Sequence, residues 1–232
     1  MFSNNLKMRI AITATPSSPG PGPLLLWGDL DGAFRQAAEL GCQGVEIHFR
    51  SAEDLNLQAV KQLMADYRLG VPTLGTGMAA GDGLSFSDPR PEIRARTVER
   101  VRGHIEFAAE VGSAVTIGIL SGKLGSRAAS ERLRRRAQAL ECLAEVCELA
   151  RRAGVIILLE PLNRYECDYI NTLDDFAKVA AEIGAANLRL LADTFHMNIE
   201  EVDLAASLKA ARSVLGHVHL ADTNRQAPGH GH

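Results

Sequence analysis

Short apolar runs alternate with longer amphipathic stretches along this chain. Seven runs have the composition of strands, at residues 8–14, 44–49, 71–77, 114–120, 155–160, 188–193 and 216–221. The runs at 155–160 and 188–193 are almost wholly apolar, which is typical of strands buried on both faces of a parallel sheet. Apolar positions recur with helical spacing at residues 29–40, 54–68, 91–112, 130–153, 173–184 and 203–213.

Capping residues support these helix boundaries. Asp88, Ser130 and Thr172 can cap the first turns of the third, fourth and fifth helices. Glycines follow the expected ends of four helices, at positions 41, 112, 154 and 184. The strict alternation of strand and helix predicts an α/β fold with a parallel sheet and helices outside it.

The number of elements bears on the fold class. A (β/α)₈ TIM barrel contains eight strands and eight helices and typically has about 250 residues. This chain has 232 residues and shows the pattern of seven strands and six helices. We therefore expect a TIM barrel from which the eighth βα unit is missing, with an open parallel sheet as the alternative. On this interpretation a chain that ends at His232 has two unpaired strand edges and is poorly stable.

The chain shows no linker and no shift in composition that would divide it. We therefore expect one TIM-barrel domain at residues 8–232, incomplete at its C-terminus. Residues 1–7 precede the first expected strand and are interpreted as a leader outside the fold.

Charge and composition exclude several function classes. The net charge of −3 gives no general attraction to nucleic acid or to an anionic membrane. No apolar run approaches the roughly 20 residues of a membrane span, and the first residues lack the apolar core of a signal peptide. The four cysteines show no CxxC spacing, which favours reduced packing thiols in a cytoplasmic protein.

Ionisable side chains stand at the ends of three consecutive expected strands. Glu160 and Asp193 close the fifth and sixth strands, and His219 lies near the end of the seventh. In a TIM barrel these ends meet at one rim, where active sites lie. A buried carboxylate is costly unless it is paired or binds a cation. Carboxylate and imidazole ligands suit Mn²⁺, Mg²⁺, Co²⁺ or Zn²⁺, so the pattern predicts a shared metal site, with a salt bridge at each strand end as the alternative.

Three further polar side chains face the barrel interior by strand phase. His217 and His219 are two residues apart, so both lie on the same side of their strand. His219 is nearer the rim and is the expected metal ligand, while His217 is expected one layer deeper. Glu46 and His48 alternate with apolar neighbours, and they either line the pocket or contact each other.

Three segments carry a resemblance to a known family. Residues 160–166, 192–201 and 216–225 resemble the ketose 3-epimerase branch of the xylose-isomerase-like TIM barrels, which includes D-tagatose 3-epimerase and 5-keto-L-gluconate epimerase. Residues 75–85 and 117–120 are most similar to the 5-keto-L-gluconate type. The resemblance covers nearly the whole chain and is more specific for the branch than for the substrate.

The resemblance implies roles for six residues. Glu160, Asp193 and His219 match three of the family's four metal ligands, and Glu160 also matches one of its two catalytic acid/bases. Residues that hold the oxygens of the sugar match Glu166, His196 and Arg225. Without the resemblance, Glu166 and Arg225 could form a loop salt bridge and His196 could cap local backbone. The family's fourth ligand, which is also its second catalytic glutamate, belongs to strand eight and has no match here.

These residue types suit proton abstraction beside a ketone. A divalent ion can stabilise the resulting enediolate, and a positioned carboxylate can serve as the base. Return of the proton from the opposite face gives an epimer, and return to the adjacent carbon from the same face gives an aldose. We therefore expect a metal-dependent epimerase, with Mn²⁺ as the first choice of metal, that acts on a keto-sugar or keto-sugar acid. No phosphate-binding glycine loop stands out, which favours an unphosphorylated substrate. The branch also implies a homo-oligomer, either a dimer or a tetramer.

Three other functions are weighed against this expectation. An aldose–ketose isomerase of the hydroxypyruvate isomerase kind would use the same residues. A phosphodiesterase related to endonuclease IV would need a cluster of metals and more than the seven histidines present, and the acidic balance lacks a DNA-binding face. A non-catalytic sugar-binding protein is the third alternative.

Overall fold

Eight parallel strands form one curled sheet in the computed structural model, which describes residues 8–18, 24, 26–125 and 128–232. The strands are β1 (Ala11–Thr15), β2 (Leu26–Trp27), β3 (Gly44–His48), β4 (Thr73–Gly75), β5 (Ala114–Ile117), β6 (Ile157–Leu159), β7 (Leu188–Asp193) and β8 (Leu215–His219). Their order in the sheet is β2-β1-β3-β4-β5-β6-β7-β8. From β3 onward, consecutive strands are therefore neighbours, as right-handed βα units of a barrel require.

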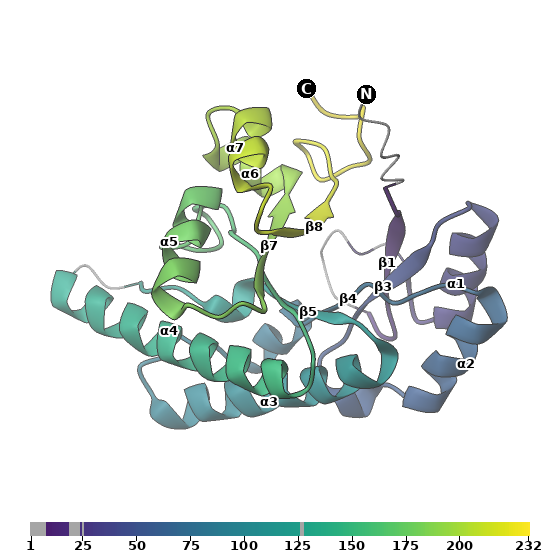
Figure 1. Ribbon diagram of the computed structural model, residues 1–232, viewed down its shortest axis with the longest axis horizontal. Coiled ribbons are helices and arrows are strands. Elements are labelled where there is room, and N and C mark those ends of the chain that lie inside the picture. Colours follow the sequence, from purple (N-terminus) through teal and green to yellow (C-terminus); the bar gives the residue numbers. More distant parts are fainter. Residues whose placement is uncertain (1–7, 19–23, 25, 126–127) are drawn as a thin grey trace.

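The main helices form an arc outside the sheet (Figure 1). They are α1 (Leu30–Glu39), α2 (Leu57–Tyr67), α3 (Pro91–Val111), α4 (Ala129–Arg152) and α5 (Leu173–Ile183), followed by α6 (Thr194–Glu200) and α7 (Leu204–Ala211). Three short 3₁₀ helices, η1 (Ala52–Asp54), η2 (Gly77–Asp82) and η3 (Ile119–Ser121), lie in loops after strands. The arrangement confirms the prediction of a TIM-barrel architecture.

All seven expected strands and six expected helices are present, with ends that differ by a few residues. Besides the 3₁₀ helices, two short elements were not expected. Strand β2 has two residues and pairs with Ala14 and Thr15 of β1, on the side away from β3. Helix α6 begins directly after β7. It is too short for the helical spacing of its apolar residues to be recognised beside the strand pattern. Residues 1–7, interpreted as a leader, lie outside the described residues.

The expected helix starts are confirmed at one of three positions. Thr172 caps α5, where its hydroxyl accepts a hydrogen bond from the N–H of Asp175 and the Asp175 carboxylate accepts one from the Thr172 N–H. The prediction at Asp88 was wrong, because α3 starts at Pro91, whose ring favours the first helical position. The Asp88 carboxylate instead accepts the N–H of Arg90. Helix α4 starts at Ala129, so Ser130 is its second residue and not its N-cap, and the prediction at Ser130 was also wrong.

The four cysteines are free thiols, as expected. Three of them are buried in the apolar core, and burial raises the pKa of Cys167 and raises that of Cys147 to about 12. A thiol held protonated in this way is a poor nucleophile and a poor metal ligand. In the described part of the chain, no helix is both long and apolar enough to cross a membrane.

The two sides of the sheet differ in polarity. In β3, Val45 and Ile47 are fully buried in the apolar core, whereas Glu46 lies between them and is buried on the other side. Thr73 of β4 and Thr116 of β5 share a hydrogen bond of 2.7 Å that is also buried. The interior side of the sheet therefore carries polar side chains, and the candidate site lies at the strand ends on this same side.

Candidate active site

The three expected metal ligands converge at one end of the sheet. Glu160 directly follows β6, and its N–H donates to the carbonyl of Ile117 at 2.9 Å. Asp193 and His219 are the last residues of the neighbouring strands β7 and β8. The His219 Nδ1 atom lies 3.3 Å from Glu160 Oε1 and 3.9 Å from Asp193 Oδ2. The structure therefore brings all three side chains together.

The Asp193 carboxylate is fixed by the helix that it starts. Its Oδ1 accepts the N–H of Phe195 at 2.7 Å, so Asp193 is the N-cap of α6. Its Oδ2 is left facing the imidazoles of His196 and His219, each at 3.9 Å. One oxygen thus holds the helix while the other remains directed into the site.

Space for the Glu160 carboxylate depends on a glycine. A Cβ atom added at Gly118, just after β5, would lie 2.7 Å from Glu160 Oε2. Gly118 therefore leaves the room that this carboxylate occupies.

The electrostatics of these groups suit a bound cation. Burial and the nearby charge of Glu160 raise the pKa of Asp193. Burial would lower the pKa of His219, but the charges of Glu46 and Glu160 outweigh it and hold that pKa well above its usual value. The largely buried carboxylates of Glu160 and Asp193, both beside the Nδ1 atom of His219, form a donor set whose charge a divalent cation neutralises and that suits Mn²⁺ or Zn²⁺.

His196 is a further candidate ligand. Ligand atoms of Glu160, Asp193 and His196 all lie within 4.8 Å of one another, although the sequence assigned His196 to the substrate. A second group of the same kind consists of Glu46, His217 and His219. His219 therefore stands between two groups of ionisable side chains.

The interior carboxylate of Glu46 contacts three imidazoles. Glu46 is 2% exposed, and its oxygens lie 2.5 Å from His48 Nε2, 3.2 Å from His217 Nε2 and 3.1 Å from His219 Nε2. Both alternatives expected for Glu46 and His48 are therefore found, because the two side chains contact each other and also border the site. A Cβ atom at Gly75 would overlap the His48 ring, so this glycine makes room for the contact.

The three expected substrate residues also meet. The Arg225 Nη2 atom lies 3.0 Å from Glu166 Oε1 and 3.0 Å from His196 Nε2. The Arg225 guanidinium stacks over the Phe195 ring at 4.1 Å from its centroid, a favourable cation–π contact. Arg225 has a φ of 62°, an unusual backbone conformation for a residue with a side chain, which is the kind of strain found at functional sites.

Donor groups approach both nitrogens of the His196 ring. The backbone N–H of Asn163 donates to His196 Nδ1 at 3.1 Å, and the Asn163 side-chain amide lies 2.8 Å from the same atom. The Arg225 guanidinium, which can only donate, lies 3.0 Å from His196 Nε2. The ring is therefore held between Asn163 and Arg225.

The sequence interpretation gave no role to Asn163, Phe195 or Gly118. Asn163 and Phe195 lie within the segments that carry the family resemblance, so their position in the motifs was the signal available. Gly118 has no side chain that could mark it in the sequence. Its importance is that a Cβ atom there would collide with the Glu160 carboxylate.

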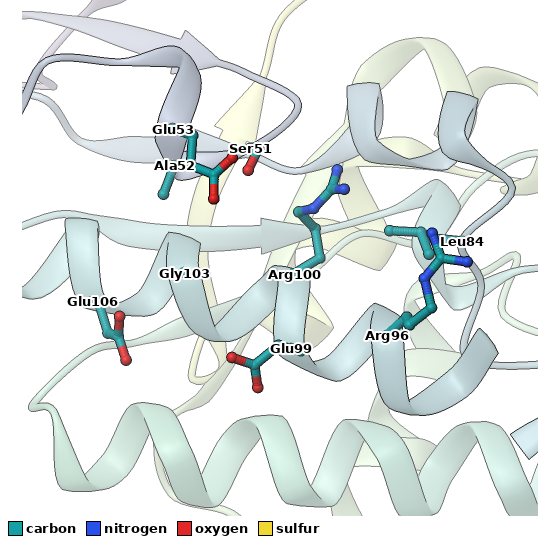
Figure 2. Close-up of a pocket in the computed structure, with 9 residues that line it drawn as sticks. All are labelled: Ser51, Ala52, Glu53, Leu84, Arg96, Glu99, Arg100, Gly103 and Glu106. Carbon is teal, nitrogen blue, oxygen red and sulfur yellow. The ribbon is translucent and has the colours of Figure 1, made fainter. Parts of the chain in front are cut away.

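A cavity of about 450 Å³ lies elsewhere, between η1 and α3 on the outer side of the barrel (Figure 2). Charged side chains of both signs line it, including Glu99, Arg96 and Arg100. None of the residues that line it belongs to the site at the strand ends.

Residues 34–232 match the family described as Xylose isomerase-like TIM barrel, and the chain belongs to that family. An L-ribulose 3-epimerase of Mesorhizobium japonicum is 28% identical over 197 residues, which cover 85% of this chain and 65% of the relative. A 3-dehydro-D-guloside 4-epimerase of Escherichia coli is 33% identical over 204 residues, which cover 85% of this chain and 76% of the relative.

A solved structure shows the same architecture. The crystal structure of 3-keto-D-glucoside 4-epimerase from E. coli, in its apo form, matches with a TM-score of 0.80 and 28% sequence identity. The match covers 97% of this chain and 83% of that chain. The family membership and the epimerase relatives confirm the resemblance to the ketose 3-epimerase branch of this family.

Proposed function

We propose that this protein is a metal-dependent epimerase that inverts a carbon beside the ketone of an unphosphorylated keto-sugar or keto-sugar acid. The observation that carries the proposal is the convergence of Glu160, Asp193 and His219 next to the contact between His196 and Arg225. The first group supplies a base at a cation site, and the second supplies contacts to sugar oxygens.

The names of the relatives support the position of the reaction. L-ribulose is a ketose with its carbonyl at carbon 2, and the enzyme named for it inverts carbon 3. A 3-dehydro sugar has its carbonyl at carbon 3, and the corresponding enzyme inverts carbon 4. In both names the inverted carbon is next to the ketone, so the shared chemistry is removal and return of an acidified C–H proton.

Glu160, Asp193 and His219 would hold the metal, for which we propose Mn²⁺, with Mg²⁺, Co²⁺ and Zn²⁺ as alternatives of the same ligand preference. A divalent ion at these residues supplies positive charge near the substrate oxygens, which lowers the cost of the negative charge that develops there.

The side chains of the chain itself then account for the proton transfer. Glu160 takes the proton from the carbon beside the ketone. The electron pair of that C–H bond forms a C=C bond to the carbonyl carbon, and the π pair of the carbonyl moves onto its oxygen to leave an enediolate. The Arg225 guanidinium donates to oxygens of the sugar, His196 lies beside it as a second contact, and Glu166 holds the guanidinium in place. Return of a proton from water to the opposite face of the same carbon gives the epimer.

The experiment that tests the proposal is incubation of the purified, Mn²⁺-loaded protein with L-ribulose and with 3-dehydro-glycosides in deuterated water. We expect deuterium to enter at the carbon beside the ketone and an inverted ketose to accumulate, both measured by NMR. An aldose product would instead support the aldose–ketose isomerase. Neither exchange nor product with any keto-sugar would contradict the proposal.

We further propose a homo-oligomer, either a dimer or a tetramer, located in the cytoplasm. Light scattering coupled to size-exclusion chromatography measures the oligomeric state directly, and a monomer at micromolar concentration would contradict the first part.

A further inference from the structure

His219 lies between two carboxylates that approach opposite nitrogens of its ring. Its Nδ1 is 3.3 Å from Glu160 Oε1, and its Nε2 is 3.1 Å from Glu46 Oε1 and 3.2 Å from Glu46 Oε2. Glu160 belongs to the proposed metal site, whereas Glu46 comes from β3 and lies 173 residues from His219 along the chain. Each nitrogen of the His219 ring therefore faces a different carboxylate.

We propose that Glu46 is a positioning residue, which accepts the Nε2–H of His219 and so directs the Nδ1 lone pair at the metal site. The inference rests on the proposed function, because it deepens the role of His219 as a ligand there. For Glu46 the sequence gave either a place in the pocket or a contact with His48, and orientation of His219 is a further role.

The chemistry of imidazole supports this role. A neutral ring carries one proton, and the nitrogen without it is the one that can bind a metal. A carboxylate that accepts one N–H therefore decides which nitrogen is the ligand, fixes the plane of the ring and makes the ligand nitrogen more basic. With Glu46 accepting the Nε2–H, only the Nδ1 atom of His219 is left to bind a cation together with Glu160 and Asp193.

Glu46 is itself held in place, as a positioning residue must be. It is 2% exposed and sits in β3, which is paired on both sides by β1 and β4. His48 and His217 contact the same carboxylate from two further directions. His219 needs such support, because β8 is an edge of the described sheet and the His219 side chain is 22% exposed.

A second metal ion on Glu46, His217 and His219 is the competing interpretation of the same cluster. That ion would take the Nε2 lone pair of His219, and the Nε2–H donor that our proposal requires would be absent. The two interpretations differ in the number of ions bound, so stoichiometry separates them.

The first measurement is Mn²⁺ affinity, by calorimetry on the metal-free full chain, which needs no substrate. We expect Glu46→Gln to weaken binding by about 10–100-fold, the usual effect of removing a carboxylate that orients a ligand histidine. Glu46→Asp keeps the charge and shortens the side chain, so it should lose most of the same affinity. Glu200→Gln removes another largely buried carboxylate, one that binds Arg164, and should leave the affinity unchanged.

The second measurement asks whether Glu46 acts through His219. In a His219→Ala background, Glu46→Gln should weaken binding by less than about threefold, because coupled residues are not additive. An equal loss in both backgrounds, or full affinity in Glu46→Asp, would mean that Glu46 acts by its charge alone and would overturn the proposal. Two Mn²⁺ ions per chain in the wild type, with one lost in Glu46→Gln, would overturn it in favour of the second metal site.

The third measurement separates this inference from the proposed function. Nitrogen-15 NMR of the neutral His219 ring, in the metal-free protein at alkaline pH, reports which nitrogen carries the proton. We expect Nε2–H in the wild type and a mixture of both forms in Glu46→Gln. If the wild type binds no metal, the proposed function fails, but the NMR result still decides the role of Glu46. The Nδ1–H form in the wild type would refute that role.

Discussion

Asp193 serves two structural roles with the two oxygens of one carboxylate. Oδ1 caps α6 and Oδ2 faces the imidazoles of the candidate metal site. Residues of the site are thus held by ordinary elements of secondary structure, and a single substitution can affect local structure and chemistry together. Variants that keep the shape of a side chain are therefore the sharpest tests at this scale.

We expect Glu160→Gln to abolish turnover and leave the fold intact. The amide keeps the size of the side chain but cannot take a proton, and a positioned base is usually worth on the order of 10²–10⁴ in rate. Epimerisation kinetics and a thermal unfolding curve measure the two effects. A well-folded variant that keeps most of its activity would rule out Glu160 as the base.

We expect His219→Ala and Asp193→Asn each to weaken Mn²⁺ binding and to lose activity that excess Mn²⁺ partly restores. Each change removes one ligand atom, and the amide of Asp193→Asn can still accept the N–H of Phe195 and cap α6. Calorimetric titration with Mn²⁺ measures the affinity. Wild-type affinity in both variants would show that the cation site lies elsewhere.

We expect Arg225→Ala to raise KM or lower kcat/KM for the keto-sugar while Mn²⁺ affinity stays the same. Arg225 contacts Glu166 and His196 but none of the three proposed metal ligands. The measurement combines steady-state kinetics with metal titration. An arginine that only braces its loop would instead lower the melting temperature and leave the kinetics nearly unchanged.

At the scale of elements, buried or half-buried acidic side chains connect the loops after the strands through hydrogen bonds. The Asp168 carboxylate, in the loop after β6, accepts hydrogen bonds from the N–H groups of Leu124 and Gly125 and from Arg132 of α4. Burial would raise the pKa of Asp168, but these donors outweigh it and lower that pKa. The tie therefore stabilises the folded state only while the carboxylate is ionised.

We expect Asp168→Asn to lower the free energy of unfolding at pH 7 by about 1.5–3 kcal/mol, the value of hydrogen bonds to a charged group. The folded-state pKa lies below the ordinary value of about 3.9 for Asp. The wild-type advantage should therefore be complete above that value and shrink as the pH falls through the folded-state pKa. Urea unfolding at a series of pH values measures this difference.

Asp174→Asn is the matched control for that experiment. Its carboxylate is 75% exposed and pairs with Lys178 on the surface of α5, so its loss should change stability little. An equal loss of stability in both variants, or a constant difference at every pH, would contradict the role given to Asp168.

At the scale of the molecule, burial decreases from the middle of the sheet toward the edge at β8. The residues of β6 are buried, whereas no residue of β8 is fully buried. In the described part of the chain, β8 pairs with β7 alone, so its other side has no strand partner. His217 and His219 therefore belong to the least buried of the strands that form the site.

We expect the amide hydrogens of β8 to exchange with deuterated water at least about tenfold faster than those of β6, because edge strands open at lower free energy. Mass spectrometry of peptic fragments measures both strands in one experiment. Saturating Mn²⁺ should slow exchange in β8 more than in β6, since His219 of that strand is a proposed ligand of the ion. Equal protection of the two strands without metal would contradict this picture.

The sequence by itself determined the alternation of strand and helix, and with it the barrel architecture. It also placed Glu160, Asp193 and His219 at strand ends, because the period of an apolar run shows where a strand stops and which residues share a face. Family motifs added Glu166, His196 and Arg225, whose roles follow from their position in those motifs.

Only the tertiary structure decided which of these side chains touch. The contact between Glu46 and His219 joins residues 173 positions apart, and that between Glu166 and Arg225 joins residues 59 apart. Such contacts depend on the curl of the sheet and the register of strands that are not neighbours, and neither is encoded in local periodicity. The ring of His219 could therefore be placed at the rim from the sequence, but the carboxylate that orients it could be found only in the folded protein.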